Sequence, residues 1–228
     1  DSFDVYSDKM GYNSYSNTKD GFKAFLKVLN RTSHCVMEAT GCYHHKLAMF
    51  LHEKGIIVSV VNPLVIKRFI QMKLRRLKTD KSDAFMIYSY ASEQSVEEWQ
   101  PEKEYIERGK ELLSLIQTYL RQATALKNKL HASESKGQTK GVIISSMKRQ
   151  LRNLKRERQF LEQELESLIK THEAKLFTRL TSIPGIGKKT AVLMMVSTSN
   201  FNSFNSYKQV SSYLGLAPNE RSSGSSIR

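Results

Sequence analysis

The sequence predicts three successive regions: an α/β domain, two long helices with a coiled-coil seam, and a compact domain that is mainly α-helical. Over residues 1–100, short β-branched runs alternate with amphipathic stretches, a pattern typical of a sheet covered by helices. Over residues 101–175, apolar residues recur at steps of three and four, which indicates long paired helices. Shorter helical stretches resume over residues 176–228. We therefore expect three domains with these bounds.

The first region alternates candidate strands with candidate helices. The candidate strands are residues 3–6, 35–37 and 56–61, and the candidate helices follow residues 17–18, cover residues 43–54 and 63–77, and begin again near residue 80. Gly55 is expected to close the second helix, and Pro63 to start the third. The predicted fold of this region is thus a layered sheet with helices packed on it.

The middle region predicts an antiparallel helical hairpin. Two apolar series define its helices, namely Leu113, Ile116, Leu120, Ala123 and Leu130, and then Met147, Leu151, Leu154, Leu161, Leu165 and Leu168. Arg158 alone interrupts the second series. The polar, glycine-containing stretch 133–141 suits a turn between the helices. Such a hairpin serves either as a spacer or as a dimerisation element, and the sequence leaves both open.

Composition favours a polyanionic partner and argues against a membrane span. The 228 residues carry 36 Lys and Arg against 22 Asp and Glu, a formal charge of +14. The longest apolar stretch, residues 56–66, contains Ser59, Asn62 and Pro63 and is shorter than the roughly 20 residues that a span requires. The first residues lack a secretory leader, and two cysteines favour a reducing compartment, so a cytoplasmic protein is expected.

Three carboxylates form a candidate metal site. Asp80 and Asp83 are three residues apart at the start of a helix, so both side chains can face one spot, where a divalent cation would relieve their repulsion. For the pair alone, compensation of the helix dipole and solvation is the simpler interpretation. Glu38 ends a predicted buried strand, where an unpaired carboxylate is costly, and its presence makes a metal role competitive with a structural one.

A tight turn at residues 182–191 is a candidate phosphate-binding site. Pro184, Gly185 and Gly187 separate two apolar helical stretches, an arrangement that resembles a helix-hairpin-helix. Its backbone N–H groups and the following helix N-terminus would face a phosphate, with Lys188 and Lys189 beside them. The alternative is an ordinary corner between two helices.

Further basic residues are candidate contacts with a nucleic-acid backbone. Arg75, Arg76 and Lys78 lead directly into the paired aspartates. A second basic run follows residues 148–158, although such runs are usually solvated faces. The Cys and His residues between positions 42 and 52 do not match common zinc spacings.

The last stretch, residues 215–226, has the composition of a loop and is most simply a linker. A serine nucleophile in it would need nearby cations, which Arg221 and Arg228 would partly supply.

Together these strings resemble the DEDD transposases of bridge-RNA-guided insertion elements, the family that includes the Piv-type DNA invertase. The resemblance rests on strings that occur in the family's order over nearly the whole chain: Glu38-Ala39-Thr40-Gly41, residues 58–63, Lys78-Thr79-Asp80 with Asp83-Ala84, residues 182–188, Gly215-Leu216-Ala217-Pro218 and residues 223–228.

The resemblance implies an RNase H-like, RuvC-like first domain, a coiled-coil middle and a C-terminal transposase domain. It places Glu38, Asp80 and Asp83 on three of the four acidic positions that hold Mg²⁺, and Ser223 on the serine that attacks a DNA phosphate and forms a covalent phosphoserine link. It further implies a guide RNA that pairs with donor and target DNA, and a dimer or tetramer that shares residues between subunits. A prokaryotic, nucleoid-associated protein of the cytoplasm is expected.

One departure from the family pattern concerns the start of the chain. The family's first acidic residue ends a strand that would immediately precede Asp1, and Asp4 does not align with it. We therefore expect the chain as given to lack one central strand and one metal ligand, to be inactive alone, and to continue in both directions in the native protein.

These inferences lead to the hypothesis of an RNA-guided DNA recombinase. One alternative is a metal-dependent nuclease or junction resolvase, in which water attacks the phosphate and hydrolysed ends result. Another is a non-catalytic nucleic-acid-binding protein, whose binding would fall steeply with salt while replacement of Asp80 changed nothing.

Overall fold

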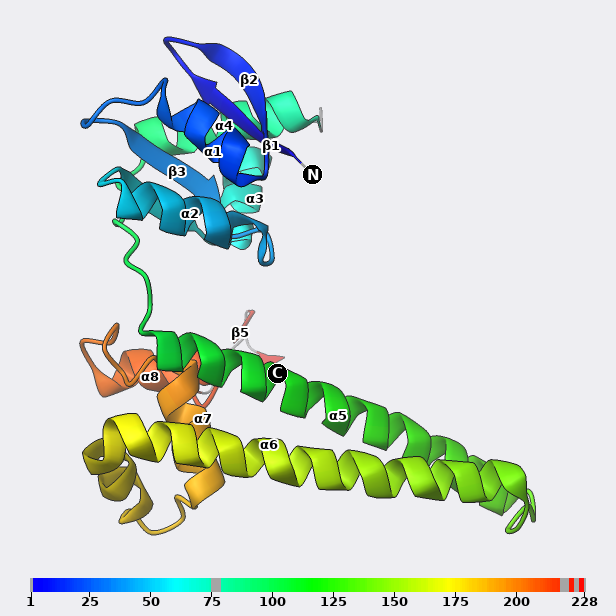
Figure 1. The fold of residues 1–228 in the computed structure, drawn as a ribbon. Helices are drawn as coiled ribbons and strands as arrows, with labels where there is room; N and C mark the ends of the chain where they lie inside the picture. Colours follow the sequence, from blue (N-terminus) through cyan, green and yellow to red (C-terminus); the bar gives the residue numbers. More distant parts are fainter. Residues whose placement is uncertain (1, 75–78, 218–221, 224–225, 228) are drawn as a thin grey trace. The chain divides into compact units, whose positions relative to one another are not determined.

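The computed structural model describes residues 2–74, 79–217, 222–223 and 226–227 (Figure 1). Contacts divide the chain into two compact units, Asp1–Pro101 and Glu102–Arg228. The first contains the expected strands and helices of the α/β region, and the second contains both the long helices and the C-terminal helices. No helix in the described part of the chain is long and apolar enough to cross a bilayer.

Two pairs of strands form the β-structure of the first unit. Strand β1 (Ser2–Ser7) pairs antiparallel with β2 (Gly11–Ser16), and β3 (His34–Glu38) pairs parallel with β4 (Ile57–Val61). Glu38, the last residue of β3, lies opposite Val61. Within the described residues these remain two separate sheets, so the single layered sheet expected from the sequence is not formed there. Strand β2 was not anticipated, because its sequence, GYNSYS, carries no β-branched side chain.

Four helices cover these strands, and several begin at side-chain caps. They are α1 (Lys19–Leu26), α2 (Tyr43–Glu53), α3 (Pro63–Met72) and α4 (Asp80–Glu93). The Thr18 hydroxyl accepts a hydrogen bond from the Gly21 N–H, and Asn62 accepts one from the Leu64 N–H at 2.8 Å. Helix α4 contacts β1, β2 and β3, so it is the element that joins the two sheets.

Helix α3 is shorter than expected. It ends at Met72 rather than at Leu77, and Leu74 has a φ of 54°. This left-handed conformation cannot continue a right-handed helix, and it has no counterpart in the hydrophobic periodicity from which the helix was predicted. Residues 75–78 lie outside the described part.

An aromatic and aliphatic core holds the first unit together. Phe22 and Phe25 of α1, Leu51 of α2 and Val58 of β4 are buried in it, and Trp99 packs against it. The Trp99 N–H also donates to the Val58 carbonyl oxygen at 2.7 Å. Trp99, which is the only tryptophan of the chain, is therefore positioned to report on the folding of this unit.

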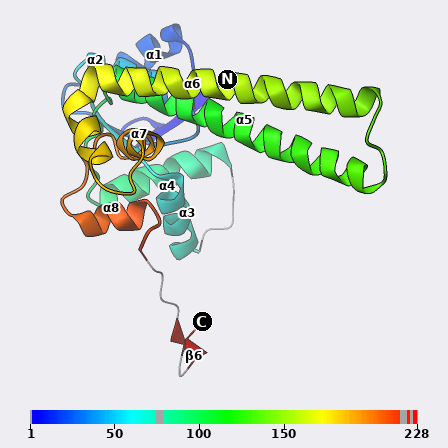
Figure 2. The ribbon, with the colours of Figure 1, turned by 90° about the horizontal axis from the view of Figure 1, so that it is seen from below.

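The second unit is built on an antiparallel pair of long helices, α5 (Glu104–Ser135) and α6 (Val142–Thr181). Figures 1 and 2 show them side by side, joined by a turn at their far end. On α6, the side chains that are buried or half-buried follow the expected steps, and Arg158 takes its place among them. On α5, the corresponding positions are Leu112, Leu113, Ile116, Tyr119, Ala123, Leu126 and Leu130, so four of the five predicted positions face inward.

The predicted seam of α5 was therefore partly wrong. Leu120 is 41% exposed, and Tyr119 and Leu126 face inward instead. The apolar residues of α5 contain two overlapping series with steps of three and four, and spacing alone does not choose between them.

Helix α6 changes direction at Glu173, which has φ −139° and ψ 45°. The Tyr105 hydroxyl donates to Glu173 Oε1 at 2.6 Å, and burial together with this bond raises the pKa of Tyr105 to about 12. Beyond the break, Phe177 and Leu180 of α6 share a core with Ile106 of α5 and with α7 (Lys188–Ser197). The remaining elements are α8 (Tyr207–Tyr213), β5 (Ser222–Ser223) and β6 (Ser226–Ile227).

We expect Gly21→Ala to destabilise the first unit by about 1–3 kcal/mol, because a Cβ at this position would lie 1.9 Å from the Ser16 carbonyl oxygen. Urea unfolding followed by Trp99 fluorescence measures the change. Gly187→Ala is the matched control, since Gly187 has an ordinary φ and no atom within 4 Å of the added methyl group. An unaltered Trp99 transition in Gly21→Ala would show that β2 and α1 separate easily.

Candidate functional site

Glu38 lies at the carboxyl end of β3, the strand that pairs in parallel with β4. The pairing continues beyond the strand, because the Ala39 N–H donates to the Val61 carbonyl oxygen at 2.9 Å. Partial burial raises the pKa of Glu38 above its ordinary value, and the negative charge of Asp83 raises it further. Two carboxylates distant in sequence thus act on each other at this strand end.

Asp80 and Asp83 occupy the first turn of α4. The helix begins at Thr79, whose hydroxyl accepts a hydrogen bond from the Ser82 N–H at 3.1 Å, and Ala84 and Met86 are buried under it. Asp83 is half-buried and interacts with Glu38. Asp80 is exposed, and its charge acts on Tyr12 of β2.

The Tyr12 hydroxyl, on which the charge of Asp80 acts, contacts a further carboxylate, that of Asp4. It donates to Asp4 Oδ1 at 2.7 Å. That hydrogen bond is the main cause of the raised pKa of Tyr12, to which burial and the charges of Asp4 and Asp80 add. The charge of Asp80 thus acts on Tyr12 of β2, whereas that of Asp83 acts on Glu38 of β3.

The three predicted metal ligands are only partly brought together. No group of three or more His, Cys, Asp and Glu side chains suitable for a metal is assembled among the described residues. The expectation that Asp80 and Asp83 face one spot together with Glu38 therefore stays a prediction, and among the described residues only Asp83 acts on Glu38. The chemistry of Glu38 and Asp83 nevertheless fits a hard divalent cation, because both offer carboxylate oxygens and their mutual repulsion favours a positive charge between them.

The turn between α6 and α7 contains two glycines, and the sequence predicts phosphate binding there. Gly185 has a φ of 89°, which favours glycine, and Gly187 precedes the first residue of α7 without a side-chain cap. The N–H groups of the first turn of α7 therefore have no capping side chain, which is the feature that suits a helix end to an anion.

The two lysines beside this turn are paired with glutamates of α6. Lys189 Nζ lies 2.6 Å from Glu162 Oε2, and Lys188 Nζ lies 3.7 Å from Glu166 Oε1. The side chains of Lys188 and Lys189 are 65% and 74% exposed, and exposed ion pairs of this kind contribute only about 0–1 kcal/mol. A phosphate would therefore compete readily with the glutamates.

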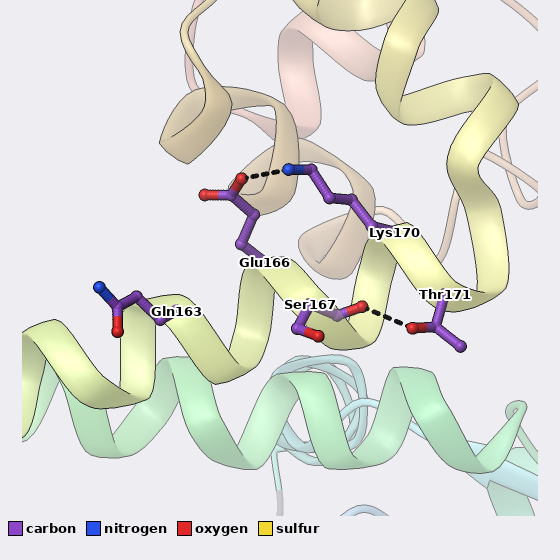
Figure 3. Close-up of a pocket in the computed structure, with 5 residues that line it drawn as sticks. All are labelled: Gln163, Glu166, Ser167, Lys170 and Thr171. Carbon is purple, nitrogen blue, oxygen red and sulfur yellow. Dashed lines mark hydrogen bonds and ion pairs between the residues drawn. The ribbon is translucent and has the colours of Figure 1, made fainter.

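An open pocket of about 430 Å³ lies on α6 next to these pairs (Figure 3). It is lined by Gln163, Glu166, Ser167, Lys170 and Thr171. Lys170 Nζ lies 2.6 Å from Glu166 Oε1, and this hydrogen bond is the main cause of the lowered pKa of Glu166. The sequence analysis missed this group, although its i, i+3, i+4 spacing would have placed it on one side of a helix.

The remaining predicted site residues are described only in part or not at all. Ser223 belongs to β5 and lies opposite Ser226 of β6 in a short antiparallel pair, and its side chain lies outside the description. Arg75, Arg76, Lys78, Arg221 and Arg228 also lie outside the described residues.

Comparison with known proteins identifies two transposase regions. The family model of the IS110-type DEDD transposase matches residues 4–133, and that of the transposase IS116/IS110/IS902 family matches residues 177–228. The first covers all three predicted carboxylates, and the second covers the turn and Ser223. These matches place the chain among the transposases of this family.

Individual relatives lead to the same class. The pilin gene-inverting protein of Moraxella bovis is 32% identical over 226 residues, which cover 94% of this chain and 67% of the relative. That of Moraxella lacunata is 32% identical over 202 residues, which cover 86% and 60%. The transposase for insertion sequence element IS1111A of Coxiella burnetii is 26% identical over 216 residues, covering 83% and 57%. The chain belongs to the IS110 family of DEDD transposases and recombinases and spans about 60% of the length of these relatives, so the resemblance drawn from its motifs is confirmed.

We expect Asp83→Asn to lower the pKa of Glu38, because the charge that raises it is removed. A carboxyl whose pKa is raised in the folded state stabilises the fold at pH values below its ordinary pKa of 4.5, and this stabilisation is lost as the pH rises through the pKa of the folded state. The variant should therefore lose less stability between acidic and neutral pH. NMR titration of the Glu38 side-chain carbon measures the pKa. Asp80→Asn is the control, and an equal shift in both variants would contradict the described placement.

Proposed function

We propose that this chain is the core of a DNA recombinase that breaks and rejoins strands through a serine nucleophile assisted by a divalent cation. The observation that carries the proposal is the packing of α4, which bears Asp83, against β3, which ends at Glu38, within the matched transposase region, where the charge of Asp83 raises the pKa of Glu38. Both residues come from motifs that the family uses for catalysis, and a structural role does not require two carboxylates to approach each other. The names of the relatives, a gene-inverting protein and a transposase, support DNA as the substrate class, and we take it to be double-stranded.

In this proposal Glu38 and Asp83 hold the cation, and Asp80 turns from Tyr12 toward it. Mg²⁺ is the preferred candidate, since it favours carboxylate oxygens and would offset the charge that develops on the scissile phosphate. We include in this proposal an RNase H-like arrangement of the β1–β2 and β3–β4 pairs.

The chemical step assigns the covalent role to Ser223. Its Oγ attacks the phosphorus, an Oγ–P bond forms, and the bond from phosphorus to the 3′ oxygen breaks. The hydroxyl proton passes to a base, and the leaving 3′ oxygen takes up a proton, so that a 5′-phosphoserine link and a free 3′ hydroxyl result. Reversal of these steps with the 3′ hydroxyl of another strand would complete an exchange.

The remaining parts of the chain would position the DNA. The uncapped start of α7, with Gly185, Gly187, Lys188 and Lys189, would bind the backbone without reading bases. Arg75, Arg76 and Lys78 would lie along the strand that enters the carboxylates, and Arg221 and Arg228 would flank the nucleophile. We also retain a guide RNA and a homo-oligomeric assembly of two or four subunits as parts of this proposal.

We expect full-length protein, incubated with Mg²⁺, duplex DNA and the RNA that co-purifies with it, to give a DNA–protein adduct on a denaturing gel. Ser223→Ala should abolish the adduct, because no other group replaces the attacking hydroxyl. Ser222→Ala, the adjacent position of β5, is the matched control and should retain it.

The carboxylates are tested in the same assay. Asp83→Asn should slow adduct formation by at least about 100-fold, the order expected when an electrostatic stabiliser of the transition state is removed. Cleavage with hydrolysed ends and no adduct would identify a nuclease instead, and DNA binding without any cleavage would identify a non-catalytic protein.

A further inference from the structure

Positive charge is concentrated in the part of the long-helix pair farthest from α7. Residues 119–158, which contain the end of α5, the turn and the start of α6, hold eleven Lys and Arg against two Glu. This segment alone carries a net charge of +9 out of the chain's +14. The opposite end of the pair holds most of its glutamates, including Glu162 and Glu166, so charge is segregated along the helices rather than interspersed.

Five of these cations share one face of α6. They are Lys148, Arg149, Arg152, Lys155 and Arg156, and all five are exposed. At 100° per residue they span about 120° of the helix circumference, on the side turned away from the residues that pack on α5. We call these five residues the basic face of α6.

The basic face is largely without counter-charges. Lys148 pairs with Glu134 at 3.4 Å, but no ion pair is found for the other four cations in the part of the chain that is described. By contrast, Lys170, Lys188 and Lys189 near α7 all pair with glutamates. Cations on successive turns of one face repel each other, and a polyanion relieves this repulsion more effectively than solvent does.

The basic face leads along α6 to the pocket and the turn. Continuing its direction by helical spacing reaches Gln163, Glu166 and Lys170, which Figure 3 shows next to one another along the helix. From Lys148 to Glu166 the helix rises about 27 Å, a length that corresponds to about 8 base pairs of duplex. Glu166 in turn contacts Lys188, so the face ends at the candidate phosphate site.

We propose that the basic face of α6 binds the backbone of double-stranded DNA and guides it to the turn before α7. This inference rests on the proposed function, which makes DNA the substrate. Guanidinium groups of three arginines suit phosphate oxygens, and the helix places them in regular steps. Residues 148–156 include no aromatic side chain on which an unpaired base would stack, a composition that favours a duplex over a single strand.

The test removes the four cations that have no ion pair. Arg149, Arg152, Lys155 and Arg156 are replaced by Gln in a Ser223→Ala background, so that no covalent capture occurs. Affinity for a random-sequence duplex of about 30 base pairs is measured by fluorescence anisotropy over a series of KCl concentrations. Because each neutralised phosphate contributes about 0.9 to the slope of log K against log salt, the slope should fall by about 3–4.

A matched control separates the basic face from net charge. Lys19, Lys27, Lys46 and Lys54 are exposed on the first unit, and their replacement by Gln removes the same charge. This control should retain the slope, and circular dichroism should show that both variants keep their helices.

Three outcomes would overturn the proposal: an unchanged slope in the basic-face variant, an equal loss in the control, or a loss of binding to RNA but not to duplex DNA. Failure of the proposed function would be seen separately, as absence of the Ser223 adduct in protein with an intact basic face.

Discussion

The packing of α4 against β3 is the constraint that brings the charge of Asp83 to bear on Glu38 in the first unit. Two carboxylates whose charges repel remain near each other only when their backbones are held by other forces. Parallel pairing with β4 holds the end of β3, and the Thr79 cap with the buried Ala84 and Met86 holds the start of α4. Packing of the apolar core thus offsets the repulsion between the Glu38 and Asp83 charges, which a bound cation would relieve.

The second unit is organised by a different balance. Its long helices are held by an apolar seam, but α7 packs on them only because α6 breaks at Glu173 and turns back. Tyr105 stabilises the conformation at this break through its hydrogen bond to Glu173. Gly109 allows α7 to pack closely, because a Cβ added at Gly109 would lie 3.2 Å from a methyl group of Val196. The turn with Gly185 and Gly187 therefore lies between helices that pack into one core, which suits it to a binding role.

Charge distribution connects the two ends of this unit. Near α7, Lys188 and Lys189 form ion pairs with Glu166 and Glu162, which an anion at the turn would have to displace. Toward the far end the cations of α6 have few such partners, and the attraction for a polyanion is greatest there. In the proposed function this gradient would let DNA associate first along the helix and then engage the turn.

The sequence by itself determined the features that depend on neighbouring residues. Capping at Asn62, the helix started by Pro63, the long periodic helices and the glycine turn all follow from local conformational preference, and the family followed from the order of the motifs. Tertiary structure decided that Asp83 rather than Asp80 acts on Glu38, that Tyr119 rather than Leu120 faces α6, and that α6 breaks at Glu173. These outcomes depend on packing between segments far apart in the chain. Periodicity and spacing do not specify this packing, because several local arrangements satisfy the same pattern and only the shared core selects among them.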